Sequence, residues 1–130
     1  MNVSRRRLLT VLAGGAVASA AARFRLGFRP ARRDDRTVWL SLVRDCRSSR
    51  AVGRAYLASL PAVPDSSDLR RRLLPSDPQR AASVVSDVER LRQHIGRQVR
   101  DDFGSGRTVQ VRGWVLAETE ARVCALIAML

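Results

Sequence analysis

Few residues of this sequence are of the types that carry out catalysis. His94 is the one histidine, so a relay of Ser, His and Asp would have to use it. No Gly-x-Ser-x-Gly motif sets a nucleophile on a tight turn. His94 stands beside Ile95 on the flank of an expected helix, where a solvent-facing or helix-capping role fits better than that of a general base. We therefore predict no catalytic residue and no enzymatic activity.

Motifs for metals and cofactors are also missing from the sequence. One histidine and two distant cysteines do not provide four soft ligands, and no carboxylates occur at calcium-loop spacing. Gly104-Ser105-Gly106 follows a helical pattern and precedes a strand, the reverse of a phosphate-binding loop. Asp101 and Asp102 point about 100° apart on a helix, so we expect a solvated helix end there. The sequence predicts neither a metal nor a cofactor.

The two cysteines, Cys46 and Cys124, leave two alternatives open. In an oxidising compartment, a disulfide between them would join the first and last helices of the domain. Both also lie in apolar helical patterns, where a free cysteine commonly acts as a small buried side chain.

The positive charge of the chain comes from arginine alone, since none of its 24 basic residues is lysine. Phosphate-binding proteins usually employ lysine as well, so this usage is more typical of GC-rich coding. Nine arginines against two aspartates give residues 1–36 a charge of +7, and fifteen arginines against ten acids give residues 37–130 a charge of +5. Without interleaved aromatic residues or zinc-finger spacing, we expect no nucleic-acid binding. The cluster Arg70-Arg71-Arg72 is either a solvated helix face or a patch for an acidic partner.

The first 22 residues have the three parts of an export signal. Arg5, Arg6 and Arg7 supply a positive start, residues 8–22 form a weakly apolar run, and residues 18–20 or 20–22 offer a small-x-small cleavage site. Fifteen residues are fewer than the roughly 20 that cross a bilayer as a helix, so we expect no permanent membrane span. The alternative is an ordinary alanine-rich helix with a basic start.

The order Ser4-Arg5-Arg6, followed by Leu8 and Leu9, resembles the twin-arginine translocation signal, Ser/Thr-Arg-Arg-x-Phe-Leu-Lys. Leu8 stands where that signal has Phe, and a threonine stands where it has Lys. Glycines and alanines dilute the apolar run, which favours this route over general secretion. The resemblance implies that the twin-arginine translocase is a partner, and that the protein is exported folded from the cytoplasm to the periplasm.

After the signal, residues 23–36 form an Arg-rich linker, and residues 37–130 are enough for one small domain with one core. Apolar residues at steps of three and four predict helix over residues 38–60. We expect an interruption at Ser48, a second helix capped by Ser49, and its end before Pro61. A short helix over residues 68–74, capped by Ser67, follows.

Ser76-Asp77-Pro78 is the clearest helix start in the chain. The apolar stripe after it predicts one long helix that ends at residues 104–106: Val84, Val88, Leu91, Ile95, Val99 and Phe103. Alternation over residues 108–116 around Arg112-Gly113 predicts a tight hairpin, and residues 117–130 a terminal helix. The predicted fold class is mainly α, a small helical bundle with a short C-terminal β-hairpin followed by a terminal helix.

The terminal helix is more apolar than a half-exposed helix of a small domain needs. Either it is the central helix of the core, or part of it awaits a partner. In the second case the partner surface contains Trp114, Leu126, Ile127 and Leu130, with Trp114 as a core or interface anchor after the turn glycine.

Residues 113–116 and 119–122 are similar to the closing segment of small uncharacterised bacterial proteins with twin-arginine signals. That resemblance implies export and adds no catalytic residue. We expect a non-enzymatic accessory or escort protein for a larger periplasmic partner, such as a cofactor-bearing oxidoreductase. The alternatives are a stand-alone periplasmic binding module and a cytosolic Arg-rich nucleic-acid-binding protein.

Overall fold

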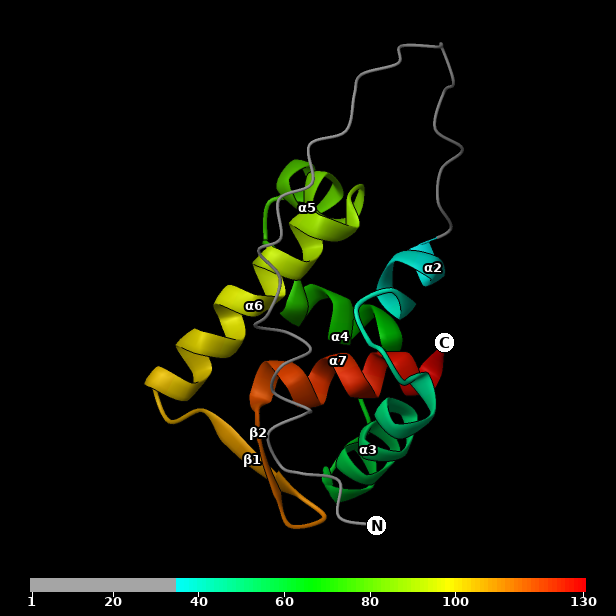
Figure 1. Cartoon of the computed structure of the whole chain (residues 1–130), viewed down its shortest axis with the longest axis vertical. Helices are drawn as coiled ribbons and strands as arrows, with labels where there is room; N and C mark the ends of the chain where they lie inside the picture. Colours follow the sequence, from blue (N-terminus) through cyan, green and yellow to red (C-terminus); the bar gives the residue numbers. More distant parts are fainter. Residues whose placement is uncertain (1–34) are drawn as a thin grey trace.

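Six helices and one hairpin follow one another in the computed structural model, which describes residues 35–130 (Figure 1). The elements are α2 (Asp35–Leu40), α3 (Cys46–Ser59), α4 (Ser66–Leu73), α5 (Pro78–Val85), α6 (Val88–Gly104), β1 (Thr108–Val111), β2 (Trp114–Ala117) and α7 (Glu118–Met129). The predicted fold class is confirmed. The export signal of residues 1–22 and linker residues 23–34 lie outside the described residues, and α2 includes residues 35 and 36, the last two of the expected linker.

An aspartate side chain caps the N-terminus of each helix from α3 to α6. Asp45 accepts hydrogen bonds from the amides of residues 47 and 48, and Asp65 accepts one from the amide of residue 68. Asp77 caps α5 ahead of Pro78, as predicted, and Asp87 caps α6. The predicted caps Ser49 and Ser67 are wrong: the aspartates stand earlier in the chain and start their helices there, because carboxylates are strong acceptors for these orphan amides.

The predicted long helix is two helices, because Asp87 breaks it. Asp87 has an extended backbone (φ −138°, ψ 122°), and its carboxylate accepts from the amide of Glu89 at 2.8 Å. The apolar stripe still continues across the break, with Val84 and Val88 half-buried and packed against the core. Spacing alone did not show the break because both sides of the turn keep their apolar residues on the core side. The end of α6 at Gly104 is confirmed.

The core forms around α7, which crosses α3 at very short range (Figure 1). Gly53 of α3 lies against the backbone of Cys124, and a Cβ atom built at Gly53 would lie 2.0 Å from the Cys124 carbonyl oxygen. No side chain fits in that space. Glycine at this position therefore permits the closest contact between the two helices.

The hairpin has the predicted turn. Strands β1 and β2 are antiparallel, with Val111 opposite Trp114, and the turn residues Arg112 (φ 51°) and Gly113 (φ 79°) are both left-handed. Two left-handed residues match the right-handed twist of a two-residue hairpin. Val111 and Leu116 face the core and are buried. The structure thus confirms a hairpin that packs on the helices and would be marginal alone.

Helix α7 is the central helix of the core, the first of the two alternatives. Leu126 and Ile127 are fully buried, so their assignment to a partner surface is wrong for this fold. They are buried because α3, α4 and α6 surround α7. Trp114 and Leu130 are half-buried and pack against the same core. Among residues 35–130, no helix is long and apolar enough to span a membrane.

Candidate partner-binding surface

Nearly every acidic side chain of the described chain has a structural role. Four aspartates cap helices, as described above. Another four acids form ion pairs with arginines: Asp35 with Arg70, Asp68 with Arg71 and Arg72, Glu89 with Arg92, and Glu118 with Arg122. Asp102 and Glu120 are buried, so the expected solvated helix end is wrong for Asp102. Asp101 is the one acid among residues 35–130 whose side chain forms neither a hydrogen bond nor an ion pair with another described residue. The predicted basic cluster of residues 70–72 is therefore largely neutralised by the protein itself.

Asp102 fastens the end of α6 to the start of α7. Its Oδ1 accepts from Arg107 Nε at 2.8 Å and its Oδ2 from the Thr119 amide at 2.8 Å. Helix α7 needs this acceptor because its own N-cap residue, Ala117, has no polar side chain. Glu120 completes the junction by accepting from the Ala117 amide at 2.9 Å. The two carboxylates thus set the position of the hairpin between α6 and α7.

The two buried carboxyls have pKa values shifted in opposite directions. Burial alone would raise the pKa of Asp102, but the hydrogen bonds from Thr119 and Arg107 outweigh it and hold that pKa below its ordinary value. Burial raises the pKa of Glu120, and the neighbouring charge of Asp102 raises it further. Split carboxyl pKa values are typical of acid–base pairs in enzymes. In this protein both Asp102 oxygens accept hydrogen bonds from other residues of the fold. Asp102 and Glu120 therefore stabilise the junction between α6 and α7.

The remaining residues of catalytic type are also engaged in the fold. His94 Nε2 lies 3.0 Å from the carbonyl oxygen of Leu73, the last residue of α4, in agreement with the expected capping role. Burial lowers the His94 pKa, and the charge of Arg97 adds to this. Cys46 and Cys124 are free thiols in the structure. Burial raises the pKa of Cys124 to about 12, so this thiol stays protonated and unreactive.

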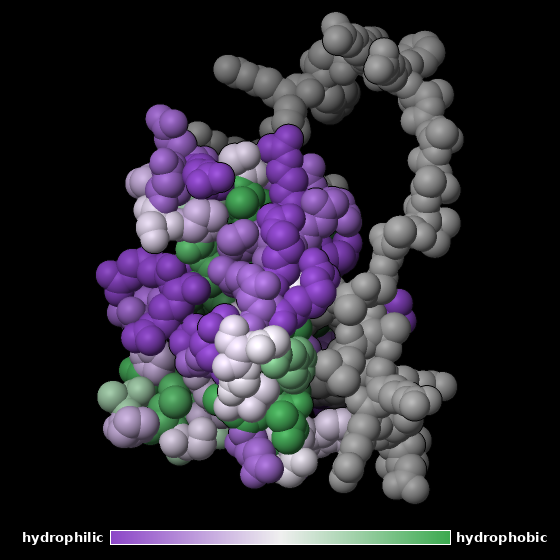
Figure 2. Space-filling view, turned by 90° about the vertical axis from the view of Figure 1, so that its left-hand side faces the viewer, coloured by the Kyte–Doolittle hydropathy of each residue, from purple (hydrophilic) through white to green (hydrophobic). Residues whose placement is uncertain are grey.

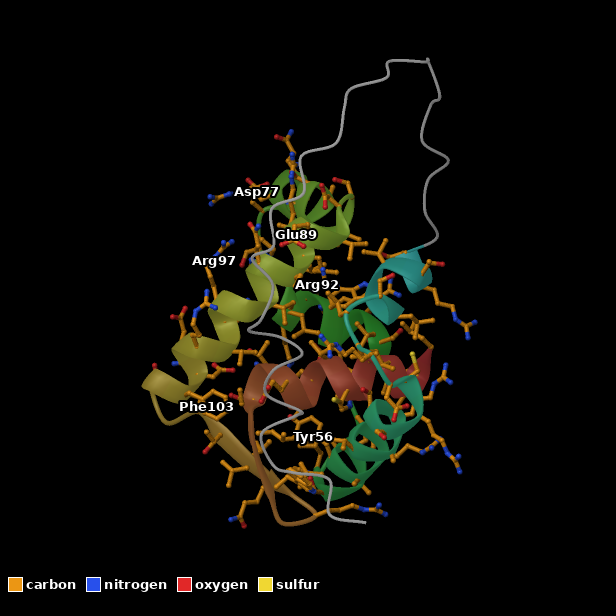
Figure 3. All side chains as sticks on the ribbon, viewed as in Figure 1. Tyr56, Asp77, Glu89, Arg92, Arg97 and Phe103 are labelled. Carbon is orange, nitrogen blue, oxygen red and sulfur yellow. The ribbon has the colours of Figure 1, made fainter. Side chains whose placement is uncertain are left out.

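The outer side of α6 carries three arginines, and one of them, Arg90, donates a hydrogen bond to Ser83 Oγ of α5 at 3.0 Å. Arg90, Arg97 and Arg100 are exposed and form no ion pair with any described acid. Figure 3 shows Arg97 on the outer side of α6 and Arg92 on the side facing α2. Arg92 is engaged, donating to the Ser41 carbonyl at 3.2 Å and to Glu89. The helix therefore has one basic side that is bonded to the rest of the fold and an outer side on which Arg97 and Arg100 form no ion pair with a described acid.

Two exposed apolar side chains lie beyond these arginines, at the end of α6 and on the hairpin that follows it. Phe103, at the end of α6, is 39% exposed, and Val115, on the solvent side of β2, is 52% exposed. On the face shown in Figure 2, hydrophilic residues cover the upper part and hydrophobic ones gather toward the lower end. We name the row Arg90, Gln93, Arg97, Arg100 and Phe103 the α6 face. Sequence reasoning missed it, although its four polar residues recur every three or four positions opposite the apolar stripe. Phe103 was expected in that stripe and is instead exposed at the end of the helix.

The described residues include no group of His, Cys, Asp and Glu that could hold a metal ion. Comparisons with known protein families, with curated proteins and with solved structures find no match to the chain. The assignment of a function consequently rests on the residues themselves.

Proposed function

We propose that the protein is an exported, non-enzymatic accessory protein that binds a larger exported partner, such as a cofactor-bearing oxidoreductase. One observation carries the proposal: the motif of Ser4, Arg5, Arg6, Leu8 and Leu9 precedes a domain whose acids, histidine and buried thiol serve the fold. A folded-export signal is of most use where a partner has to receive its cofactor before transport. The chain would then provide the signal for both proteins.

The α6 face supports this role as the surface that meets the partner. Its three arginines lack acidic partners within the described chain, and an acidic protein surface would supply them. Interfaces favour arginine and aromatic residues over lysine, and this face ends in exposed Phe103. Complementary charge of this kind increases the rate and specificity of association. We therefore propose a partner with an acidic patch beside an apolar one.

Co-export tests the proposal. An oxidoreductase whose gene is found beside that of this chain is expressed with and without it, and both proteins are followed in cytoplasmic and periplasmic fractions. We expect the oxidoreductase to reach the periplasm only together with the chain. Replacing Arg5 and Arg6 by lysine keeps the charge but removes the guanidinium geometry, and both proteins should then stay in the cytoplasm.

Three outcomes contradict the proposal. Export of the oxidoreductase without the chain would show that no escort is needed, and a gene with no such neighbour would remove the partner. Steeply salt-dependent retention on DNA would favour the nucleic-acid alternative instead. Normal export of the double lysine variant would contradict the twin-arginine signal alone.

A further inference from the structure

A cavity of about 230 Å³ lies away from the α6 face, at the corner where α3, α4 and α7 meet. The end of α3 and the loop after it form one wall, with Leu60, Pro61 and Pro64, and Leu69 of α4 lies opposite. These walls are apolar, and the prolines limit backbone movement in the loop. The volume is sufficient for a ligand of about ten heavy atoms and too small for a nucleotide.

Tyr56 brings a polar atom to the cavity without a partner for it. The residue is only 6% exposed, and it lies on the side of α3 that faces α7 (Figure 3). Its backbone carbonyl accepts from Ser59, but its hydroxyl forms no hydrogen bond with any residue of the described chain. The hydroxyl is not one of the fully buried polar atoms that lack a partner, which are Trp39 Nε1, Arg70 Nε and Gln98 Oε1. The Tyr56 hydroxyl is thus available to a ligand in the cavity.

Two arginines and one glutamate complete the lining. Arg72 uses Nε to bind Asp68 at 3.0 Å, and Arg122 uses Nη2 to bind Glu118. A guanidinium has five N–H donors, so each arginine keeps donors for another acceptor. Asp68 is also shared with Arg71, so the ion pairs around the cavity leave an excess of positive charge.

We propose that this cavity binds a small carboxylic acid with an apolar body. Its carboxylate accepts hydrogen bonds from Arg72, Arg122 and the Tyr56 hydroxyl, and its body lies against the leucines and prolines. Planar guanidinium groups bind carboxylates through paired N–H donors, and this gives such a site a preference for carboxylate over a neutral group. The site is separate from the α6 face and does not depend on the proposed accessory function.

Benzoate is the probe, because it combines a carboxylate with an apolar ring and has nine heavy atoms. We titrate it into the full chain, follow amide signals by NMR, and compare it with benzyl alcohol, a neutral analogue of similar size. We expect saturable binding of benzoate at a Kd on the order of 1 mM and about tenfold weaker binding of benzyl alcohol.

Three variants locate the site. Arg72→Gln should weaken benzoate binding about tenfold, and Tyr56→Phe, which keeps the ring in the core, about threefold. Arg71→Gln is the matched control, since Arg71 also pairs with Asp68 but does not line the cavity, and its Kd should equal that of the wild type. Thermal melting shows whether each variant is folded.

The proposal is overturned by any of three results. Equal affinity for benzoate and benzyl alcohol would indicate an apolar cavity with no preference for a carboxylate. Equal weakening by Arg72→Gln and Arg71→Gln would indicate a nonspecific effect of surface charge. No saturation by benzoate up to about 50 mM, well above the expected Kd, would show that the cavity takes no such acid.

Discussion

The α3–α7 crossing and the α6 face contrast in what their residues do. At the crossing, Gly53 meets the backbone of Cys124 so closely that no other residue fits. On the α6 face, Arg97 and Arg100 contact no acid of the described chain and support no other element. The comparison indicates that stability and the proposed partner binding depend on different residues of this small domain. Substitutions should therefore separate them.

The largest effect on stability should come from Gly53→Ala. The added Cβ would lie 2.0 Å from the Cys124 carbonyl oxygen, and neither helix can relieve this by rotating a side chain. We expect a loss of about 3 kcal/mol or more in the free energy of unfolding, measured by urea denaturation. Gly104→Ala is the control, because nothing lies within 4 Å of a Cβ there. Similar losses in both variants would mean that α3 and α7 do not pack as described.

Asp102→Ala should have the next largest effect. It removes the acceptor for the Thr119 amide and the partner of Arg107, so α7 loses its cap. We expect a loss of about 2–4 kcal/mol by thermal or urea unfolding. Asp101→Ala alters the adjacent exposed acid and should change stability by less than about 0.5 kcal/mol. If Asp101 proves the more sensitive of the two, the junction between α6 and α7 is misassigned.

Glu120→Gln should change how stability depends on pH. The folded-state pKa of Glu120 is raised above its ordinary 4.5, so between these values the folded protein binds more protons than the unfolded chain. The contribution of Glu120 to the free energy of unfolding of the wild type should therefore decrease as the pH rises above about 4.5. Gln retains an oxygen for the Ala117 amide and removes the charge beside Asp102.

The test is a series of urea unfolding curves from pH 4 to pH 8 for both proteins. His94, whose lowered pKa adds stability as the pH rises toward 6.5, acts equally in both, so the difference between the curves isolates Glu120. We expect the free energy of unfolding of the variant to increase relative to that of the wild type as the pH rises. A constant difference across the series would show that Glu120 has no raised pKa.

The smallest effect on stability should come from Arg97→Gln combined with Arg100→Gln. Neither arginine holds another element, so the free energy of unfolding should change by less than about 0.5 kcal/mol. The affinity for the proposed partner should nevertheless fall about tenfold, measured by titration at low salt. Arg44→Gln with Arg47→Gln makes the same charge change on exposed residues near the start of α3 and should leave the affinity unchanged. An equal loss of affinity in both double variants would show that the interaction depends on net charge and not on the α6 face.

Local signals in the sequence predicted much of the fold. Asp77 ahead of Pro78 marks a helix start, and Arg112-Gly113 between alternating residues marks the hairpin, because each depends on neighbouring backbone atoms only. The helix break at Asp87 was not predicted, because the valines on either side of it keep helical spacing. Serine and aspartate both cap helices well, so residue type alone does not identify Asp45 rather than Ser49 as the cap of α3.

Features that join distant segments could not be predicted from these signals. Asp102 caps a helix that starts sixteen residues later, and nothing in its own neighbourhood indicates this. Gly53 is one of several glycines, and only the path of α7 gives it a special role. The cavity beside Tyr56 likewise combines residues of three helices. Such sites depend on tertiary packing, which short-range periodicity does not contain.

The position of α7 in the chain also governs when the protein can fold during its synthesis. The helices made before it direct their buried leucines and isoleucine toward a place that α7 alone fills. A nascent chain that has not yet passed residue 117 therefore has no core to form, and its apolar surfaces stay available to chaperones. The contact between Gly53 and Cys124 spans about seventy residues, and contacts of such long range form slowly. Ribosomes that stop early would release unfolded fragments, which cellular proteases can remove.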